Sequence, residues 1–254
     1  MNNCTTRVEL KIYRDCSGAS TVTNNITWNP ITAGCSAPTP ISAWSTQVTT
    51  EVTPLCPTIV TQCSSPNAPV NGVEEYSWFR DYDICSQPNC EFEVAWSTCC
   101  RNAAITSLAN ASSNSMYNYM TVNTGVTPCN NSPVYTRLPL FYACNGQSYN
   151  VHQGAFDPDG DSLVFSLSPC YNTNSSTPVT YSTGYSPTQP LGPTWNVSLD
   201  PVSGMLTILP NPGSLVVGVV CIQVEEYRNG QLIATNMRDV QVIIISCPPN
   251  NNPA

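Results

Sequence analysis

The chain has 254 residues, of which 41% are hydrophobic, so it is long and apolar enough for one large or two ordinary domains. Only 9% of the residues are charged, against about 25% in a typical soluble domain, and the formal net charge is −8. With only eight Lys and Arg residues, this surface excludes binding to nucleic acid and attraction to anionic lipid, because the cations that neutralise phosphate are missing. No apolar run is long enough to cross a membrane, so no membrane insertion is expected.

Apolar and polar residues alternate with a period of two along most of the chain, which predicts strands rather than helices. Proline and glycine clusters separate these runs at short intervals, a pattern typical of β-sandwiches. The Asn229-Gly230 pair predicts a tight hairpin turn between the last two strands. In chain order, strands are expected at residues 7–12, 73–83, 91–96, 116–123, 162–167, 178–185, 205–209, 215–227 and 232–246, with one weak helix at 101–110.

Fourteen cysteines are spread over almost the whole chain, and none of them form a C-x-x-C pair, which argues against a zinc site. We interpret them as several disulfides in an extracellular, oxidising compartment, the alternative being buried thiols in a cytosolic protein. Because adjacent cysteines rarely pair with each other, Cys99 and Cys100 are expected to have different partners. The disulfide candidates are Cys4, Cys16, Cys35, Cys56, Cys63, Cys85, Cys90, Cys99, Cys100, Cys129, Cys144, Cys170, Cys221 and Cys247.

The sequence divides into two predicted domains and a tail. Residues 1–135 contain most of the cysteines, and residues 136–248 form a series of strands and loops with an acidic loop of their own. Residues 249–254, rich in Pro and Asn, are expected to be a linker tail of a module cut from a longer secreted protein. The predicted fold class is all-β: two tandem immunoglobulin-like β-sandwiches, rich in disulfides.

The acidic loop places Asp157, Asp159 and Asp161 at alternate positions, separated by Pro158 and Gly160. Three carboxylates that converge in one tight turn repel one another unless a cation lies among them, and hard oxygen ligands at this spacing suit Ca²⁺. An EF-hand is excluded, because its sixth and twelfth positions require Gly and Glu and the chain has serine at both. The alternative is a solvated turn without metal. Acids from other loops would complete the calcium shell, and the candidates are Glu225, Glu226 and Asp239.

Residues for catalysis are few. His152 is the only histidine, and a structural role for it is favoured over a Ser-His-Asp or Cys-His arrangement. Carboxylates for sugar hydrolysis would come from Glu74, Glu75, Glu91 and Glu93, but nothing in their spacing selects a pair. The chain is therefore not predicted to be an enzyme, although a glycan-active enzyme stays as an alternative.

Carbohydrate binding by exposed aromatic side chains is a further alternative, because sandwich domains often bind sugars through such a platform. The candidate platform residues are Trp28, Trp44, Trp78, Tyr117, Tyr119, Tyr181, Tyr185 and Trp195.

Arg-Asp pairs occur at 14–15, 80–81 and 238–239 and use three of the eight basic residues. Adjacent residues on a strand face opposite ways, so the two members of a pair do not bind each other. Each arginine is expected either to support a carboxylate cluster or to lie on the surface.

Several short stretches together resemble a known family. They lie at 13–18 (Tyr-Arg-Asp-Cys-Ser-Gly), 52–57 (Val-Thr-Pro-Leu-Cys-Pro), 72–76, 99–105 (Cys-Cys-Arg-Asn-Ala-Ala-Ile), 131–133, 154–161, 226–230 and 238–239. In this order they are similar to a segment of the very large cysteine-containing surface proteins of Bacteroidota, which are associated with gliding motility and exported by type IX secretion. The resemblance covers about residues 7 to 247.

The second predicted domain also resembles cadherin-like domains, in its Asp-Pro-Asp-Gly-Asp-Ser-Leu run and in the hairpin at 200–206. This resemblance implies a calcium-binding role for Asp157, Asp159 and Asp161. The chain lacks the Asp-x-Asn-Asp-Asn linker of true cadherins, so cadherin-type self-adhesion is not implied. The expected function is that of a non-enzymatic, calcium-stabilised structural or adhesive module of a long cell-surface protein or filament. Its expected partners are neighbouring modules or like subunits, and also surface glycans or other cells.

Overall fold

The computed structural model describes residues 5–18, 22–53, 59–127, 129–139, 141–210 and 215–246. Cys4, Cys56, Cys247 and the predicted linker tail lie outside these ranges. The described chain is all-β, as predicted. Its strands are β1 (Thr5–Asp15), β2 (Ile26–Pro30), β3 (Thr39–Pro40), β4 (Val48–Glu51), β5 (Val73–Asp83), β6 (Glu91–Thr98), β7 (Met116–Asn123), β8 (Val134–Tyr135), β9 (Phe141–Cys144), β10 (Tyr149–His152), β11 (Ala155–Phe156), β12 (Ser162–Ser168), β13 (Trp195–Leu199), β14 (Met205–Pro210), β15 (Val217–Arg228) and β16 (Gln231–Ile245).

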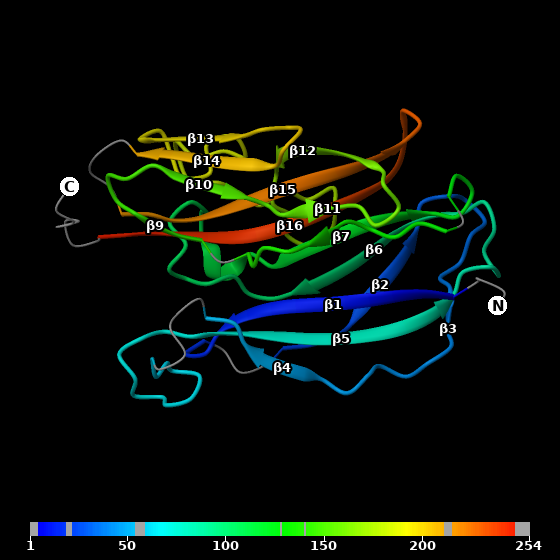
Figure 1. Cartoon of the computed structure of the whole chain (residues 1–254), viewed down its shortest axis with the longest axis horizontal. Helices are drawn as coiled ribbons and strands as arrows, with labels where there is room; N and C mark the ends of the chain where they lie inside the picture. Colours follow the sequence, from blue (N-terminus) through cyan, green and yellow to red (C-terminus); the bar gives the residue numbers. More distant parts are fainter. Residues whose placement is uncertain are drawn as a thin grey trace.

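One large sheet runs through both halves of the chain, in the order β12-β15-β16-β7-β6-β2, with β9 parallel to β16. Two smaller sheets cover it, one formed by β1, β5, β3 and β4 and the other by β10, β14 and β13. In Figure 1 the β1–β5 layer lies on one side of the molecule and the β13–β14 layer on the other, with the large sheet between them. The result is two β-sandwiches that lie side by side and share a sheet.

Each sandwich has its own core. In the N-terminal half, Val8 of β1 and Tyr82 of β5 pack against Trp28 and Phe92 of the large sheet. The C-terminal core is made by the alternate residues of β15 and β16 that face β13 and β14, and it buries Phe165, Trp195, Val197, Leu206, Ile208, Val220, Ile222, Val224, Val240, Val242 and Ile244. Alternation with a period of two therefore supplies the apolar face of each of these cores, as the sequence predicts. β15 is buried on both faces, because Val219 and Cys221 pack in a separate cluster on the side opposite Val220 and Ile222.

Two of the predicted elements are not present as such. Residues 101–110 form turns and bends instead of a helix, and the short 3₁₀ turn Ala111–Ser113 follows them. Residues 178–185 pair only through isolated bridges at Pro178 and Tyr181 instead of forming a strand. Among the described residues, no helix is long and apolar enough to span a membrane.

Disulfides join the loops to the strands. The pairs are Cys16–Cys63, Cys35–Cys90, Cys99–Cys100 and Cys170–Cys221, and Cys85 and Cys144 are also disulfide-bonded. The expectation that Cys99 and Cys100 have different partners is wrong: the peptide bond between them is cis, which brings the two Cα atoms within 3.1 Å, and their sulfur atoms are bonded to each other. Cys129 is exposed and has a free thiol.

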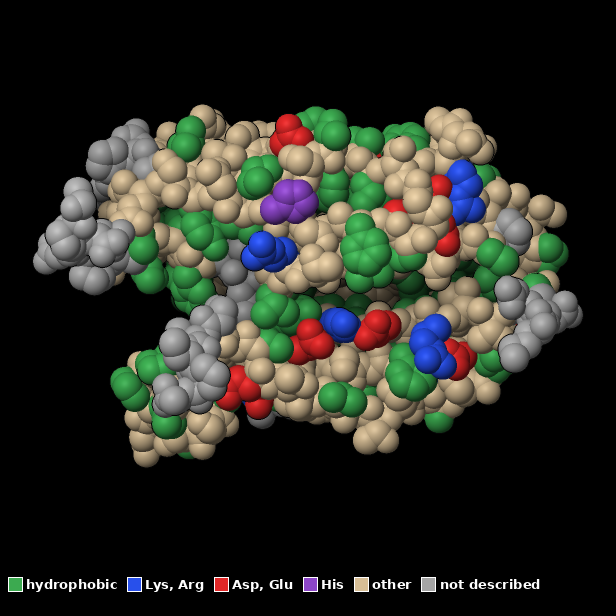
Figure 2. Space-filling model, viewed as in Figure 1, with side chains coloured by type: hydrophobic (Ala, Val, Ile, Leu, Met, Phe, Trp, Pro, Cys, Tyr) green, Lys and Arg blue, Asp and Glu red, His purple; other side chains and the backbone are tan. Residues whose placement is uncertain are grey.

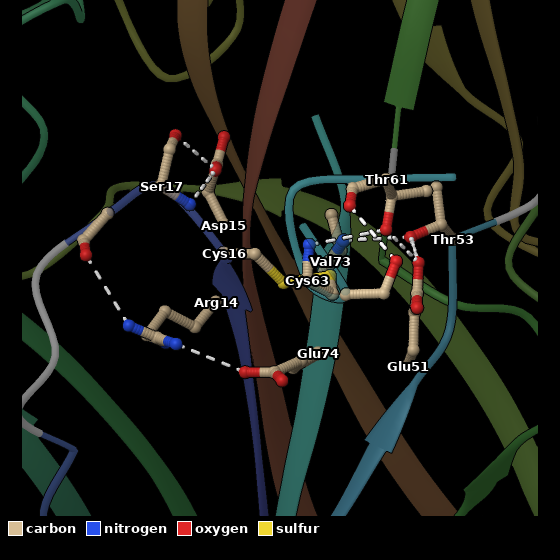
Figure 3. The surroundings of a disulfide bond; sticks show 12 residues. Arg14, Asp15, Cys16, Ser17, Glu51, Thr53, Thr61, Cys63, Val73 and Glu74 are labelled. Atoms are coloured by element: carbon tan, nitrogen blue, oxygen red, sulfur yellow. Dashed lines mark hydrogen bonds and ion pairs between the residues drawn. A yellow bond between two sulfur atoms is a disulfide. The ribbon is translucent and has the colours of Figure 1, made fainter. Parts of the chain in front are cut away.

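The Cys16–Cys63 bond fastens the loop at 59–72 to the end of β1. Figure 3 shows it beside two polar contacts, the ion pair between Arg14 and Glu74 and the hydrogen bond from the Val73 amide to the Thr53 hydroxyl. The Arg14 guanidinium lies 3.1 Å from the Glu74 carboxylate. Disulfide and ion pair together hold the ends of β1 and β5 in register.

A buried ion pair connects the segment after β6 to β16. The Arg101 guanidinium donates to both carboxylate oxygens of Asp239, at 3.0 and 2.6 Å, and each side chain is only 1% exposed. The same guanidinium also donates to the carbonyl oxygens of Ser115 and Tyr171. Positions 14, 70 and 138 residues away in the sequence therefore meet at one arginine. Because a buried charge is costly when it is unpaired, loss of either partner is strongly destabilising.

We expect Arg101→Leu to lower the free energy of unfolding by about 3–5 kcal/mol, because it leaves the Asp239 carboxylate buried without a cation. The matched control is Arg7→Leu, which breaks the exposed Arg7–Asp81 pair, whose arginine side chain is 58% exposed. Exposed pairs contribute about 0–1 kcal/mol. Urea unfolding of the two variants measures the difference. Equal losses of the free energy of unfolding would show that the buried pair stabilises the protein no more than the exposed pair does.

The double variant Cys170→Ala/Cys221→Ala is expected to lose about 4 kcal/mol by the chain-entropy estimate for a crosslink of this length. The bond spans 51 residues and holds the loop after β12 to β15 inside a buried cluster. Cys129→Ser, at the free exposed thiol, is the control and should unfold at the wild-type urea concentration. If both variants unfold at the same urea concentration without reductant, the Cys170–Cys221 bond does not stabilise the fold.

Candidate metal centre

The acidic loop, residues 157–161, joins β11 to β12 and folds around its first carboxylate. One oxygen of Asp157, Oδ1, accepts hydrogen bonds from the backbone amides of Asp159 and Asp161, at 2.8 and 3.0 Å. Gly160 supplies the left-handed turn that closes the loop, with φ of 84°. The other Asp157 oxygen, Oδ2, is buried and has no hydrogen-bond partner in the structure.

Glu226 of β15 lies beneath this loop and is fully buried, at 0% exposure. Its Oε2 accepts a hydrogen bond of 2.7 Å from the Asn130 side-chain amide, and its Oε1 is buried without a partner. One carboxylate oxygen from each of Asp157, Asp161 and Glu226 lies within 4.8 Å of the others. We call these three residues the carboxylate cluster.

Strand pairing places the cluster. Leu163, two residues after the loop, pairs with Glu226, so the loop must lie over the end of β15. Glu226 shares the inward face of β15 with Ile222 and Val224, whereas Glu225 faces the opposite way. There Glu225 accepts hydrogen bonds from the Gln223 amide and the Tyr227 hydroxyl.

The pKa of the Glu226 carboxyl is raised to about 7, chiefly by burial and also by the neighbouring charges of Asp157, Asp161 and Asp159. The hydrogen bond from Asn130 acts in the opposite direction. A carboxyl in this position resists ionisation because its negative charge is desolvated and faces other negative charges.

Arg228, at the end of β15, supplies the cluster with one positive charge. Its guanidinium donates to both oxygens of Asp161, at 2.8 and 2.6 Å, and to Asp159 at 3.3 Å. Asp159 is turned toward the segment before β8 and accepts two hydrogen bonds of 2.8 Å from Asn131, which lower the pKa of its carboxyl. One arginine thus faces four carboxylates, and the group keeps a net negative charge when all four are ionised.

The structure brings together part of the predicted calcium set. Asp157, Asp161 and Glu226 form the cluster, and Asp159 lies in the same loop but is held by Asn131 and Arg228. Glu225 faces away, and Asp239 is committed to Arg101 on the other face of β16. Three polar neighbours of the cluster were not predicted from the sequence, namely Asn130, Asn131 and Arg228. The two asparagines bond across sequence separations of 28 residues to Asp159 and 96 residues to Glu226, and Arg228 directly precedes the predicted Asn229-Gly230 turn.

The donor set fits a hard divalent cation. All candidate ligand atoms are carboxylate oxygens, which Ca²⁺ and Mg²⁺ prefer, and no His or Cys of the described chain joins them. The two buried oxygens without partners, Asp157 Oδ2 and Glu226 Oε1, are the positions where a cation would replace missing hydrogen bonds. A Ca²⁺ ion would supply charge neutralisation and crosslink the loop to β15.

Two other acidic groupings are already occupied by protein bonds. Cys16 and Cys63 are disulfide-bonded beside Glu74, which pairs with Arg14. The second grouping is the Cys170–Cys221 disulfide beside Asp239, which pairs with Arg101. Neither offers a thiolate or a free carboxylate to a metal.

The residues considered for catalysis are dispersed. His152 is exposed, and its Nδ1 accepts a hydrogen bond of 2.9 Å from the Gly154 amide. Glu74, Glu75 and Glu93 accept hydrogen bonds from the hydroxyls of three different tyrosines, Tyr76, Tyr13 and Tyr117. Of the aromatic residues proposed as a sugar platform, Trp28, Trp78, Tyr117 and Trp195 are buried and are part of the packing.

No protein-family model and no curated protein matches the sequence. The structure is similar to a solved structure described as tandem Ig repeats of Dlar, with 11% sequence identity over 94% of this chain and 90% of that chain. The TM-score is 0.26, so this similarity carries no argument about function.

We expect the metal-free protein to lose stability as the pH rises from about 5 to about 7.5. The pKa of Glu226 is raised on folding to about 7, so the folded state binds this proton more tightly than the unfolded state. That contribution is fully present below the unfolded pKa and is lost as the pH passes the folded pKa, at a cost of about 2–3 kcal/mol. Urea unfolding in chelator at several pH values measures it. Glu226→Gln should remove the slope, and a slope unchanged in that variant would assign it to other groups.

Proposed function

We propose that this chain is a non-enzymatic, calcium-stabilised structural or adhesive module of a long extracellular surface protein or filament. The observation that carries the proposal is the buried Glu226 carboxylate, which faces Asp157 and Asp161 with one oxygen of Glu226 and one of Asp157 lacking any partner. An anionic arrangement of this kind costs free energy at neutral pH unless a cation compensates it.

Calcium would act mechanically in this module. Bound at the cluster, it links the β11–β12 loop to the end of β15, and through Asn130 it holds the segment that precedes β8. The loop and this segment lie outside the strands, so strand pairing alone does not hold them in place. Extracellular calcium modules bind with dissociation constants of about 10⁻⁴–10⁻³ M, so the site would be filled outside a cell and empty inside it.

The disulfides support the extracellular location. Four pairs join positions across the described chain, and such crosslinks persist in oxidising compartments. The sequence resembles surface proteins of Bacteroidota that are associated with gliding motility. This resemblance supports a structural role in which the chain contacts neighbouring modules of the same polypeptide or like subunits. The tyrosine hydrogen bonds of the glutamates and the separate position of His152 support a non-catalytic role.

Calcium at ten times its dissociation constant is expected to add about 1.4 kcal/mol to the free energy of unfolding. For a chain of this size that corresponds to a rise in melting temperature of about 4 °C, and EDTA should reverse it. Glu226→Gln should abolish the rise, and in EDTA this variant should melt at or above the wild-type temperature because one buried negative charge is gone.

The matched control is Glu225→Gln, which removes the neighbouring carboxylate on the opposite face of the same strand. It should respond to calcium as the wild type does. Differential scanning calorimetry of the three proteins, with calcium and with EDTA, makes the comparison. A wild-type melt that calcium leaves unchanged would remove the basis of the proposed function.

A further inference from the structure

Arg238 of β16 is a buried cation that the chain leaves without an acidic partner. The residue is 9% exposed, and no ion pair joins it to any Asp or Glu, all of which lie within the described residues. Its guanidinium donates to neutral oxygens, at 3.1 Å to Gln153 Oε1 and at 3.0 Å to the carbonyl of Arg137, and lies 4.2 Å from the centre of the Tyr135 ring. Its positive charge is therefore held in place but not neutralised.

A donor beside Arg238 has no acceptor. Gln153 is fully buried, and its Nε2 has no hydrogen-bond partner in the structure, while its Oε1 is taken by Arg238. Buried amide donors are almost always paired in folded proteins. Arg238 therefore offers a positive charge that no carboxylate pairs with, and Gln153 beside it offers an N–H donor without an acceptor.

Two more basic side chains lie at the surface above this pair. Arg137 and His152 are both exposed, and they meet at a tight turn, where a Cβ placed on Gly154 would lie 2.8 Å from Cγ of Arg137. Because Nδ1 of His152 accepts from the Gly154 amide, its proton sits on Nε2, which is free to donate outward. Phe156 follows on the next strand and is 51% exposed. We call Arg137, His152, Phe156 and Arg238 the basic lip.

The basic lip borders a hollow between the two halves of the molecule. Figure 2 shows this hollow crossing the face, with the histidine and a basic side chain next to each other along one edge. Tyr13 of β1 comes from the facing half. Burial and the Glu75 carboxylate raise the pKa of its hydroxyl, and the charge of Arg238 acts in the opposite direction, so the two side chains lie near each other. On the facing edge Glu9 is paired with Lys11, and Glu75 accepts a hydrogen bond from Tyr13.

We propose that the basic lip binds an acidic polysaccharide, a chain of sugars that carry carboxylates, lying in this hollow. Arg137 and His152 would donate to the sugar carboxylate, since a guanidinium matches a carboxylate with two parallel hydrogen bonds. Phe156 provides an apolar face against which a sugar ring packs, and Arg238 supplies an uncompensated positive charge beneath.

The size and charge of the surface favour this ligand over macromolecules of other kinds. A stable protein–protein interface uses about 20–30 residues on each side, whereas the basic lip has four. A nucleic acid would meet a protein of net charge −8 with too few cations to neutralise its phosphates.

The probe is oligogalacturonate, with neutral dextran as its uncharged counterpart, and the measurement is isothermal titration calorimetry at low salt in EDTA. The chelator is needed because uronates bind calcium themselves. We expect the wild type to bind the acidic oligosaccharide and not dextran. Arg137→Gln should weaken binding about tenfold, the loss of one charge-assisted contact, with an unchanged melting temperature. Phe156→Ala should weaken binding as well.

The control is Arg7→Gln, which removes an exposed cation paired with Asp81, six residues and about 20 Å along β1 from Tyr13, and should leave the affinity unchanged. Glu226→Gln should also bind normally, so a failure of the calcium site and a failure of the basic lip are separate results. The proposal is overturned if the wild type does not bind oligogalacturonate, binds dextran equally well, or keeps full affinity in Arg137→Gln. Equal binding of polyglutamate would also overturn it and assign the surface to an acidic protein partner.

Discussion

The β15–β16 hairpin is the constraint on which the rest of the molecule depends. Its two strands lie at the centre of the large sheet, and their residues belong to the main C-terminal core. Alternation along these strands decides which charges meet. On β16 it sends Asp239 to Arg101 on one face and leaves Arg238 to Gln153 on the other. On β15 it sends Glu226 inward beneath the acidic loop and Glu225 outward.

Because the chain has few charged residues, its electrostatic interactions are confined to a small number of side-chain groups. The buried Arg101–Asp239 pair is saturated with hydrogen bonds and holds four segments together. The carboxylate cluster is the opposite case, because a single arginine faces four acids and two buried oxygens keep no partner. The first is a complete structural interaction, and the second is the site at which we propose that a cation binds. In a protein with a typical content of charged residues, many more ion pairs would be present, and the difference between the paired Arg101–Asp239 charges and the uncompensated carboxylate cluster would be harder to see.

The parts of the fold that sequence predicts are those that simple alternation determines. The runs at β1, β5, β6, β7, β12 and β14–β16 all have an apolar face and were expected, whereas two-residue strands such as β3 and β8 carry no pattern to detect. Residues 101–110 looked helical by composition, but Arg101 is fixed by Asp239, and the Thr106 amide bonds to the carbonyl of Val217, so the segment follows β15 instead.

The candidate site was predictable in part, for similar reasons. The acidic loop is visible in the sequence, and Glu226 follows from the pairing of β12 with β15. Alternation alone argues against Glu225, and Asp239 pairs with Cys221, five residues from Glu226 and about 17 Å along the strand. Asn130 and Asn131 could not be found, because only the fold brings them to the loop.

The most direct measurement is a crystal structure grown with calcium, read by anomalous scattering. The account predicts one ion about 2.3–2.6 Å from oxygens of Asp157, Asp161 and Glu226. A well-ordered cluster without an ion at millimolar calcium would contradict it.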